Sequence, residues 1–142
     1  MYSKVLLAVD GSDNNKSATL EAIDIVKAMG ASLTAVYVSS GTSVKPNAFG
    51  GDVSGTERKN IADTAAEEAF AFVKKSAASA GIELETLILV GNPGKEIAKI
   101  TKDYDLVVCG SLGLSGISRM LMGSVSSDIV KYSYCPVLIS RE

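Results

Sequence analysis

Glycine and hydroxyl residues in the C-terminal third of the chain have a spacing that suits phosphate binding. An apolar run leads into the pattern G-x-x-G, nine residues, G-S, which is formed by Gly110, Gly113, Gly123 and Ser124. Glycine lets the backbone approach a ligand where a Cβ would clash, and the unpaired N–H groups of a helix N-terminus attract anions. The pattern therefore predicts a phosphate site at the carboxyl end of a strand. The alternative is a structural Gly/Ser loop with Ser124 as an ordinary N-cap.

Three further side chains could serve a nucleotide. Asp10, at the end of the first apolar run, could accept hydrogen bonds from ribose hydroxyls, or it could cap its own loop. Val38 could offer backbone groups to a base edge and its side chain to a ring face, or it could be plain core. Arg119 could pair with phosphate, with a solvated loop charge as the alternative.

Other nucleotide and metal motifs are absent from the sequence. The segment from Gly91 to Glu96 resembles a P-loop, but it is too short between its glycines and has Glu where Ser or Thr should follow the lysine, so we interpret it as a turn and a helix start. The fingerprint G-x-G-x-x-G is also missing. The chain has no histidine, and Cys109 and Cys135 do not form a zinc pattern, so no metal site built from side chains is expected. Both cysteines are expected to be reduced, which favours an intracellular protein.

Apolar runs and helical periods alternate along the chain. Strands that alternate with helices form a parallel sheet covered on both faces, so we expect an α/β fold. Ligands bind such sheets at the carboxyl ends of strands, where Asp10 and Gly110 would face each other if the first and fourth strands are neighbours. A polar stretch over 39–56 has no clear period and is given no role. Strands are expected over 4–9, 33–38, 84–90, 105–109 and 136–140, and helices over 14–29, 57–80, 95–101 and 124–132.

Length and charge favour one domain without a nucleic-acid partner. The chain has 142 residues, which we expect to form a single domain over 1–142. Its net charge is -2 and its basic residues are not gathered into a run, so nucleic acid is a poor candidate partner. No signal peptide and no apolar stretch long enough for a membrane span is apparent, which favours a soluble, cytoplasmic protein with no membrane partner.

The combination of these motifs resembles the universal stress protein family. The resemblance covers essentially the whole chain and rests on the opening stretch Val5–Ser12, the glycine pattern from Gly110 to Ser124, the following Val125-Ser126 and the closing stretch Cys135–Ile139. It implies a three-layer α/β/α fold of the adenine nucleotide alpha hydrolase-like type, with a five-stranded parallel sheet in the order 3-2-1-4-5. The complete glycine pattern is the hallmark of the ATP-binding branch of the family.

The resemblance also implies roles for individual residues. Asp10 would lie near the ribose and Val38 near the adenine, while Gly110 and Gly113 would approach ribose and phosphate. Two residues on adjacent strands would flank the pocket, namely Ala8 and Cys109. The phosphates would be held by the residues at the last expected helix start, which are Gly123, Ser124, Val125 and Ser126.

These expectations lead to one preferred function and two alternatives. The preferred function is an ATP-binding regulatory or stress-response protein, with ADP or AMP as other possible nucleotides, Mg²⁺ held mainly by phosphate oxygens and water, and at most slow hydrolysis. The closing stretch Val137–Ile139 would lie at a sheet edge, where dimerisation would cover it, and a protein partner is unidentified. The alternatives are a dimeric interaction module of the same family that binds no nucleotide, and a genuine ATP-hydrolysing or nucleotidyl-transferring enzyme.

Overall fold

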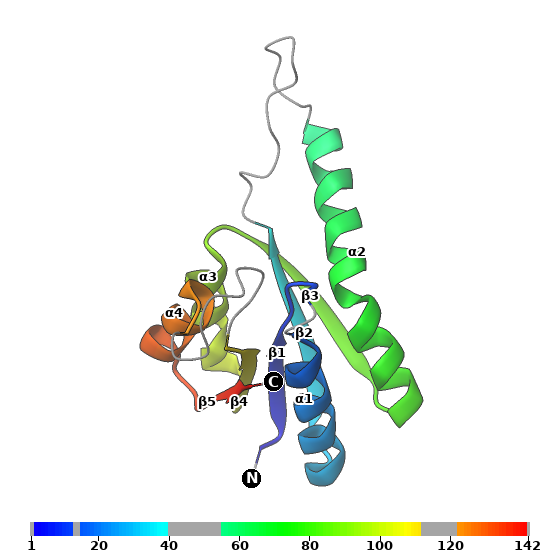
Figure 1. Cartoon of the computed structure of the whole chain (residues 1–142), viewed down its shortest axis with the longest axis vertical. Coiled ribbons are helices and arrows are strands. Elements are labelled where there is room, and N and C mark those ends of the chain that lie inside the picture. Colours follow the sequence, from blue (N-terminus) through cyan, green and yellow to red (C-terminus); the bar gives the residue numbers. More distant parts are fainter. Residues whose placement is uncertain (1, 13–14, 40–54, 112–121, 142) are drawn as a thin grey trace.

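The computed structural model of the chain describes residues 2–12, 15–39, 55–111 and 122–141. Within these ranges the chain forms one sheet with helices on both of its faces (Figure 1). Helices α1 and α2 lie on one side of the sheet, and α3 and α4 lie on the other. The three-layer α/β/α arrangement expected from the alternation of strands and helices is therefore confirmed.

All described strands run parallel, as expected for strands joined by helices. The sheet has five strands in the order β3-β2-β1-β4-β5, so the order 3-2-1-4-5 implied by the resemblance is confirmed. Strand β1 is central, with β2 and β4 as its neighbours. The strands are β1 (Lys4–Ala8), β2 (Ser32–Ser39), β3 (Leu84–Val90), β4 (Leu106–Gly110) and β5 (Val137–Ser140).

The helices begin and end close to the expected residues. Helix α3 begins two residues earlier than expected, because Pro93 takes the first helical position and the Asn92 side chain accepts a hydrogen bond from the N–H of Lys95. Helix α1 ends at Gly30, whose φ of 64° is the left-handed conformation typical of a glycine C-cap. The helices are α1 (Lys16–Met29), α2 (Gly55–Ala80), α3 (Pro93–Ile100) and α4 (Ser124–Tyr132), with a 3₁₀ turn η2 (Thr101–Asp103) after α3.

Alternate residues of the central strand β1 belong to two different core layers. Val5 and Leu7 pack in the layer that includes α1 and α2, whereas Leu6 and Ala8 pack in the layer that includes α3 and α4. Burial of a leucine side chain stabilises a fold by about 1.5–3 kcal/mol. The continuous apolar run of β1 is thus explained by a strand that is buried on both faces.

A carboxylate fixes the register of β1 against β4 at the amino end of the sheet. One oxygen of Asp105, Oδ2, accepts hydrogen bonds from the N–H groups of Ser3 (2.8 Å) and Lys4 (2.9 Å). The N–H of Asp105 in turn donates to the carbonyl of Lys4 at 2.8 Å. The two bonds to the side chain favour the ionised carboxylate and so lower the pKa of Asp105. The bond from Ser3 has the larger effect, and the bond from Lys4 comes next. Because both strands start in register, their carboxyl ends also lie side by side.

Candidate functional site

The carboxyl ends of β1 and β4 meet at the middle of one sheet edge. Leu7 of β1 is paired with Val108 of β4. Asp10 therefore follows β1 next to Gly110, which is the last residue of the neighbouring strand β4. This is the arrangement in which the sequence placed a ligand crevice. It brings together the end of the first strand and the start of the glycine pattern, which are far apart in the sequence.

The Asp10 carboxylate is folded over its own turn. Its Oδ1 accepts hydrogen bonds from the N–H (2.8 Å) and the hydroxyl (2.6 Å) of Ser12. Gly11 lies between them with φ 79°, and a Cβ at this glycine would stand 3.4 Å from the Cα of Ala69 in α2. Within the part of the chain that the structure describes, the second oxygen, Oδ2, accepts no hydrogen bond. Asp10 therefore caps its turn with one oxygen, while its other oxygen has no donor among the described residues.

A buried amide that the sequence analysis missed ties this turn to the sheet. The Asn15 side chain donates from Nδ2 to the carbonyl of Ala8 at 2.9 Å. Asn15 is the N-cap residue of α1, but its side chain makes no bond to the helix N–H groups. An asparagine just before a helical period is typical of an N-cap. The sequence could therefore have indicated that Asn15 begins the helix, but not that its side chain bonds to Ala8. The bond ties the N-cap residue of α1 to the carboxyl end of β1.

Small and aliphatic side chains form the layer beneath this edge. Ala8, Val38 and Cys109 are all buried in the core cluster on the α3 and α4 side of the sheet. Burial raises the pKa of the Cys109 thiol to about 12, so this cysteine is neutral at ordinary pH. A neutral, buried thiol is not a nucleophile. The three residues provide an apolar floor at the ends of three adjacent strands.

Hydrogen bonds join the two ends of the glycine-rich segment. The N–H of Gly123 donates to the carbonyl of Ser111 at 2.8 Å. The Ser126 hydroxyl lies 3.1 Å from the same carbonyl and 3.1 Å from that of Gly123, so it donates to the main chain. Gly113 and Arg119 lie outside the described residues, as does the stretch 40–54. The start of α4 is therefore held directly against the end of β4.

Within the described residues, the first turn of α4 has no side-chain cap. Gly123 is the N-cap residue, with φ -65° and ψ 165°, and no described side chain accepts a hydrogen bond from the helix N–H groups. Ser124 is thus the first helical residue rather than the N-cap that the alternative interpretation assumed. Ser124 and Val125 are exposed. Since the first N–H groups of a helix have no partner within it, this turn presents donors at the same edge as Asp10 and Gly110.

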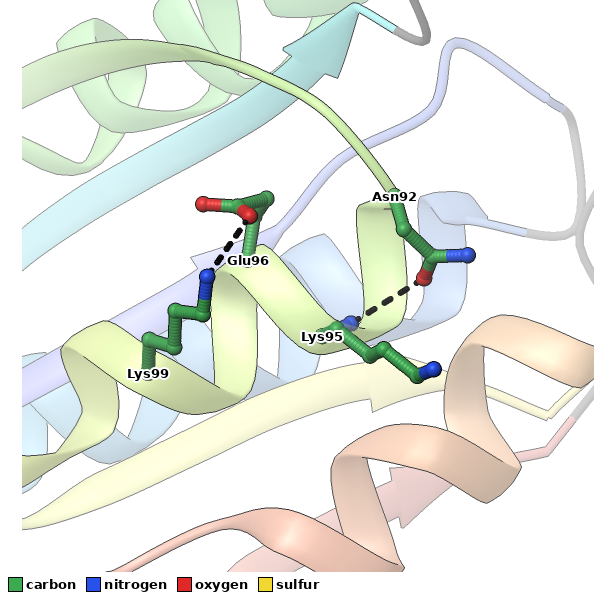
Figure 2. Close-up of polar contacts among 4 residues, drawn as sticks. All are labelled: Asn92, Lys95, Glu96 and Lys99. Atoms are coloured by element: carbon green, nitrogen blue, oxygen red, sulfur yellow. Dashed lines mark hydrogen bonds and ion pairs between the residues drawn. The ribbon is translucent and has the colours of Figure 1, made fainter.

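Helix α3 begins against the first turn of α4. A Cβ built on Gly94 would lie 2.5 Å from the Cβ of Asp128 and 3.0 Å from the carbonyl oxygen of Val125. Figure 2 shows the capped start of α3, with the Asn92 side chain 3.3 Å from the N–H of Lys95. The sequence analysis recognised a turn and a helix start here, but the contact with α4 joins distant segments and has no local signal.

The described residues offer no ready-made metal centre. No group of three or more His, Cys, Asp or Glu side chains within these ranges is arranged to hold a metal ion. An open cleft of ≈ 740 Å³ lies at the other end of the sheet, between the ends of α1 and α2 and the starts of β2 and β3. It is separate from the edge that carries Asp10. Among the described helices, none has the length and apolar character needed to cross a membrane.

Comparison with known proteins places the whole chain in one group of relatives. The model of the Universal stress protein family matches residues 1–141. A universal stress protein of Methanocaldococcus jannaschii is 35% identical over 147 residues, which cover 100% of this chain and 84% of the relative. The solved structure of UspA from Lactobacillus plantarum has a TM-score of 0.78 and 27% identity, with 99% of this chain and 98% of that chain covered. A universal stress protein solved in complex with cAMP has a TM-score of 0.68 and 26% identity, with 99% and 97% covered.

Proposed function

The chain belongs to the universal stress protein family, and we propose that it is an ATP-binding regulatory protein of the stress response. The nucleotide binds at the carboxyl edge of the sheet, where β1, β4 and α4 meet. The complex of a related protein with cAMP supports an adenine nucleotide as the ligand class. ADP and AMP are the other candidates for the natural ligand.

The uncapped first turn of α4 is the observation that carries this proposal. Gly123 has a negative φ that every residue adopts, so its backbone does not require glycine. Ser, Thr, Asp or Asn at an N-cap would accept hydrogen bonds from the N–H groups of the first turn. Glycine leaves these groups, and the space above them, to a ligand. Phosphate is the anion that best suits such a helix N-terminus.

Each residue of the edge takes a role that its geometry allows. Oδ2 of Asp10 accepts from the ribose hydroxyls, since Oδ1 is occupied by Ser12. Val38 contacts the adenine, and Ala8 and Cys109 form the apolar floor below it. Gly110 and Gly113 give the ribose and phosphates room to approach the backbone.

The phosphates are held mainly by main-chain groups of α4. The N–H groups of Ser124, Val125 and Ser126 belong to its first turn. The Ser126 hydroxyl donates to main-chain carbonyls, so this residue acts on phosphate through its N–H rather than its side chain. The exposed Ser124 hydroxyl is the side-chain donor of the site.

Mg²⁺ accompanies the nucleotide and is held mainly by phosphate oxygens and water. The described residues assemble no carboxylate cluster that would hold the ion by themselves. The chain has no histidine to act as a general base. We therefore infer a nucleotide sensor with at most slow hydrolysis, working in the cytoplasm, where its cysteines stay reduced.

A homodimer through β5 completes the proposal. This strand is an edge of the described sheet, and its residues Val137–Ile139 are only partly buried. Val130 and Tyr132 of the neighbouring helix α4 are also exposed. An uncovered apolar edge pairs readily with another chain. Sedimentation velocity over a range of concentrations tests the dimer, and a monomer at all concentrations would count against it.

Calorimetric titration of the purified protein with ATP, ADP and AMP in the presence of Mg²⁺ tests the proposed ligand. An aliquot is denatured first to identify any nucleotide that copurifies. Ser124→Ala and Gly123→Ala should weaken binding, whereas Ser32→Ala, at the amino end of β2, should not. No binding to a folded, nucleotide-free sample would overturn the proposal and favour an interaction module.

A further inference from the structure

Two donors from one residue hold the Asp10 carboxylate in a single orientation. Its Oδ1 accepts the N–H of Ser12 at 2.8 Å and the hydroxyl of Ser12 at 2.6 Å. The shorter distance is typical of a charge-assisted bond between a hydroxyl and a carboxylate. Each oxygen of an ionised carboxylate can accept about two hydrogen bonds, so Ser12 fills the acceptor positions of Oδ1. The acceptor positions that remain belong to Oδ2, which has no donor among the described residues.

The turn that contains these two residues is fixed by its neighbours. The carbonyl of Ser12 accepts the N–H of Asn15 at 3.1 Å. The buried Asn15 side chain donates to the carbonyl of Ala8 at 2.9 Å, which ties the turn to the end of β1. Gly11 lies against α2, where a Cβ would stand 3.4 Å from the Cα of Ala69. The orientation of the carboxylate is therefore set by a turn that is already ordered, as a binding site requires.

The Ser12 hydroxyl adds orientation to a turn that the main chain already closes. The bond from the Ser12 N–H to Oδ1 is the bond with which an aspartate side chain forms a turn with the residue two positions on. The terminal torsion of an aspartate is broad, so a carboxylate held by this bond alone can rotate over a wide range. A second bond to the same oxygen restricts that rotation. Loss of the hydroxyl should therefore affect the direction of Oδ2 more than the fold of the turn.

We propose that Ser12 is a positioning residue: its hydroxyl holds the Asp10 carboxylate so that Oδ2 accepts from the ribose diol, and the site thereby selects ribonucleotides over nucleotides that lack these hydroxyls. This inference rests on the proposed function. A site built to bond a hydroxyl rejects the analogue that lacks it, because the acceptor is then left unpaired. Asp10 is partly buried, so an unpaired carboxylate oxygen lowers the affinity for such an analogue.

The test is calorimetric titration of the full chain with ATP and with 2′,3′-dideoxy-ATP, which differ only in the two ribose hydroxyls. We expect the original chain to bind ATP at least about tenfold more tightly, the effect of one charge-assisted hydrogen bond. Ser12→Ala should reduce this ratio about threefold or more by weakening ATP binding, while its affinity for dideoxy-ATP stays within about twofold. Ser12→Thr keeps the hydroxyl and should keep the ratio. Ser32→Ala is the matched control, because it removes an exposed serine hydroxyl at the amino end of β2.

A double-mutant cycle separates an effect through Asp10 from a general loosening of the site. Asp10→Ala removes the carboxylate, so adding Ser12→Ala to it should cause no further loss of ATP affinity. Additive losses, or an equal loss for ATP and dideoxy-ATP in Ser12→Ala, would overturn the positioning role. Equal affinity of the original chain for both nucleotides would overturn the ribose selectivity and leave the proposed ATP site intact. If the original chain binds neither nucleotide, the proposed function fails and this inference fails with it.

Discussion

The main-chain N–H of Gly123 donates a 2.8 Å hydrogen bond to the main-chain carbonyl of Ser111, so the start of α4 is held against the end of β4. The buried Ser126 hydroxyl, 3.1 Å from the same carbonyl, reinforces this connection. The first N–H groups of α4 are therefore fixed in position before any ligand arrives. Preorganised donors of this kind bind an anion without the cost of ordering a loop.

Gly123→Ser should change stability and nucleotide binding in opposite directions. A serine at the N-cap would accept hydrogen bonds from the first turn of α4 and raise the free energy of unfolding by about 0.3 kcal/mol. The same hydroxyl would occupy the donors proposed for phosphate, so ATP affinity should fall about tenfold or more. Urea denaturation and calorimetric titration measure the two effects.

Gly123→Ala is the matched control for this change. Alanine cannot cap, so the free energy of unfolding should fall by about 1 kcal/mol relative to the serine variant. ATP binding should still weaken, because the Cβ occupies the space left by glycine. If Gly123→Ser stabilised the protein and kept full ATP affinity, the first turn of α4 would not be the phosphate site.

Replacing Ser124 or Ser126 by alanine should affect stability and ATP affinity differently, although the two residues lie in the same turn of α4. Ser126→Ala removes a buried donor and should lower the free energy of unfolding by about 1 kcal/mol. Its effect on ATP affinity should be small, since its proposed contact uses the main-chain N–H. Ser124→Ala removes an exposed hydroxyl, so stability should stay within about 0.5 kcal/mol, while ATP affinity falls.

Denaturation curves and titrations of both serine variants decide this prediction. The pair serves as its own control, because each variant loses one hydroxyl from the same turn. A larger loss of ATP affinity in Ser126→Ala than in Ser124→Ala would reverse the assignment of side-chain and main-chain roles.

Asn15→Ala should destabilise the fold although it alters no predicted ligand contact. It removes the donor that meets the Ala8 carbonyl at 2.9 Å in a buried place. Loss of such a bond should lower the free energy of unfolding by about 1–3 kcal/mol. Asn92→Ala is the comparison, since it removes an exposed cap of α3 and should cost about 0.5–1 kcal/mol. Equal losses in urea denaturation would mean that the buried bond from Asn15 to Ala8 stabilises the fold no more than an exposed helix cap does.

Local signals in the sequence predict much of this fold. The helix expected over 124–132 is found as α4, because Ser124 and Ser126 after Gly123 mark a helix start locally. The apolar run at the start of the chain forms β1, whose neighbours on both sides bury it. Both features depend on residues that are close in the sequence.

Contacts between distant segments could not be predicted in this way. The sequence placed Asp10 at the edge but left open whether it caps its own turn, which it does with one oxygen. Two contacts depend on how the helices pack on the sheet and on each other. They are the bond from Asn15 to Ala8 and the packing of Gly94 against α4. The direction of the Ser126 hydroxyl likewise follows from the position of Ser111.

Asp105 should make the fold less stable in acid. Hydrogen bonds from the N–H groups of Ser3 and Lys4 favour its ionised form and lower its pKa in the folded protein. A depressed folded-state pKa contributes stability above the unfolded pKa, which is about 3.9, and this contribution is lost as the pH falls through the folded-state value.

Urea denaturation at several pH values measures the effect for the original chain and for Asp105→Asn. The variant cannot ionise at this position, so its stability should decline less as the pH falls from about 6 to about 2. The two curves should converge at the acid end. Parallel curves over this whole range would mean that the Asp105 carboxylate does not contribute to acid sensitivity.

Gly94→Ala should destabilise the protein even though alanine is the better helix former. In an open helix this change would gain about 1 kcal/mol. Here the new Cβ would meet the Asp128 Cβ at 2.5 Å and the Val125 carbonyl at 3.0 Å, and only a shift of the two helices can relieve that contact. Overpacking of this kind costs about 1–3 kcal/mol.

A double-mutant cycle separates this steric effect from helix propensity. Asp128→Gly removes the nearer of the two contacts, so the loss caused by Gly94→Ala should be smaller in its presence, with a coupling of about 0.5 kcal/mol or more. Gly30→Ala provides the contrast: it has φ 64° and no atom near its Cβ position, so its cost comes from backbone strain and should not depend on Asp128. Additive losses for Gly94→Ala and Asp128→Gly would mean that α3 and α4 can move apart freely. A close contact between their first turns would then not be required for the fold.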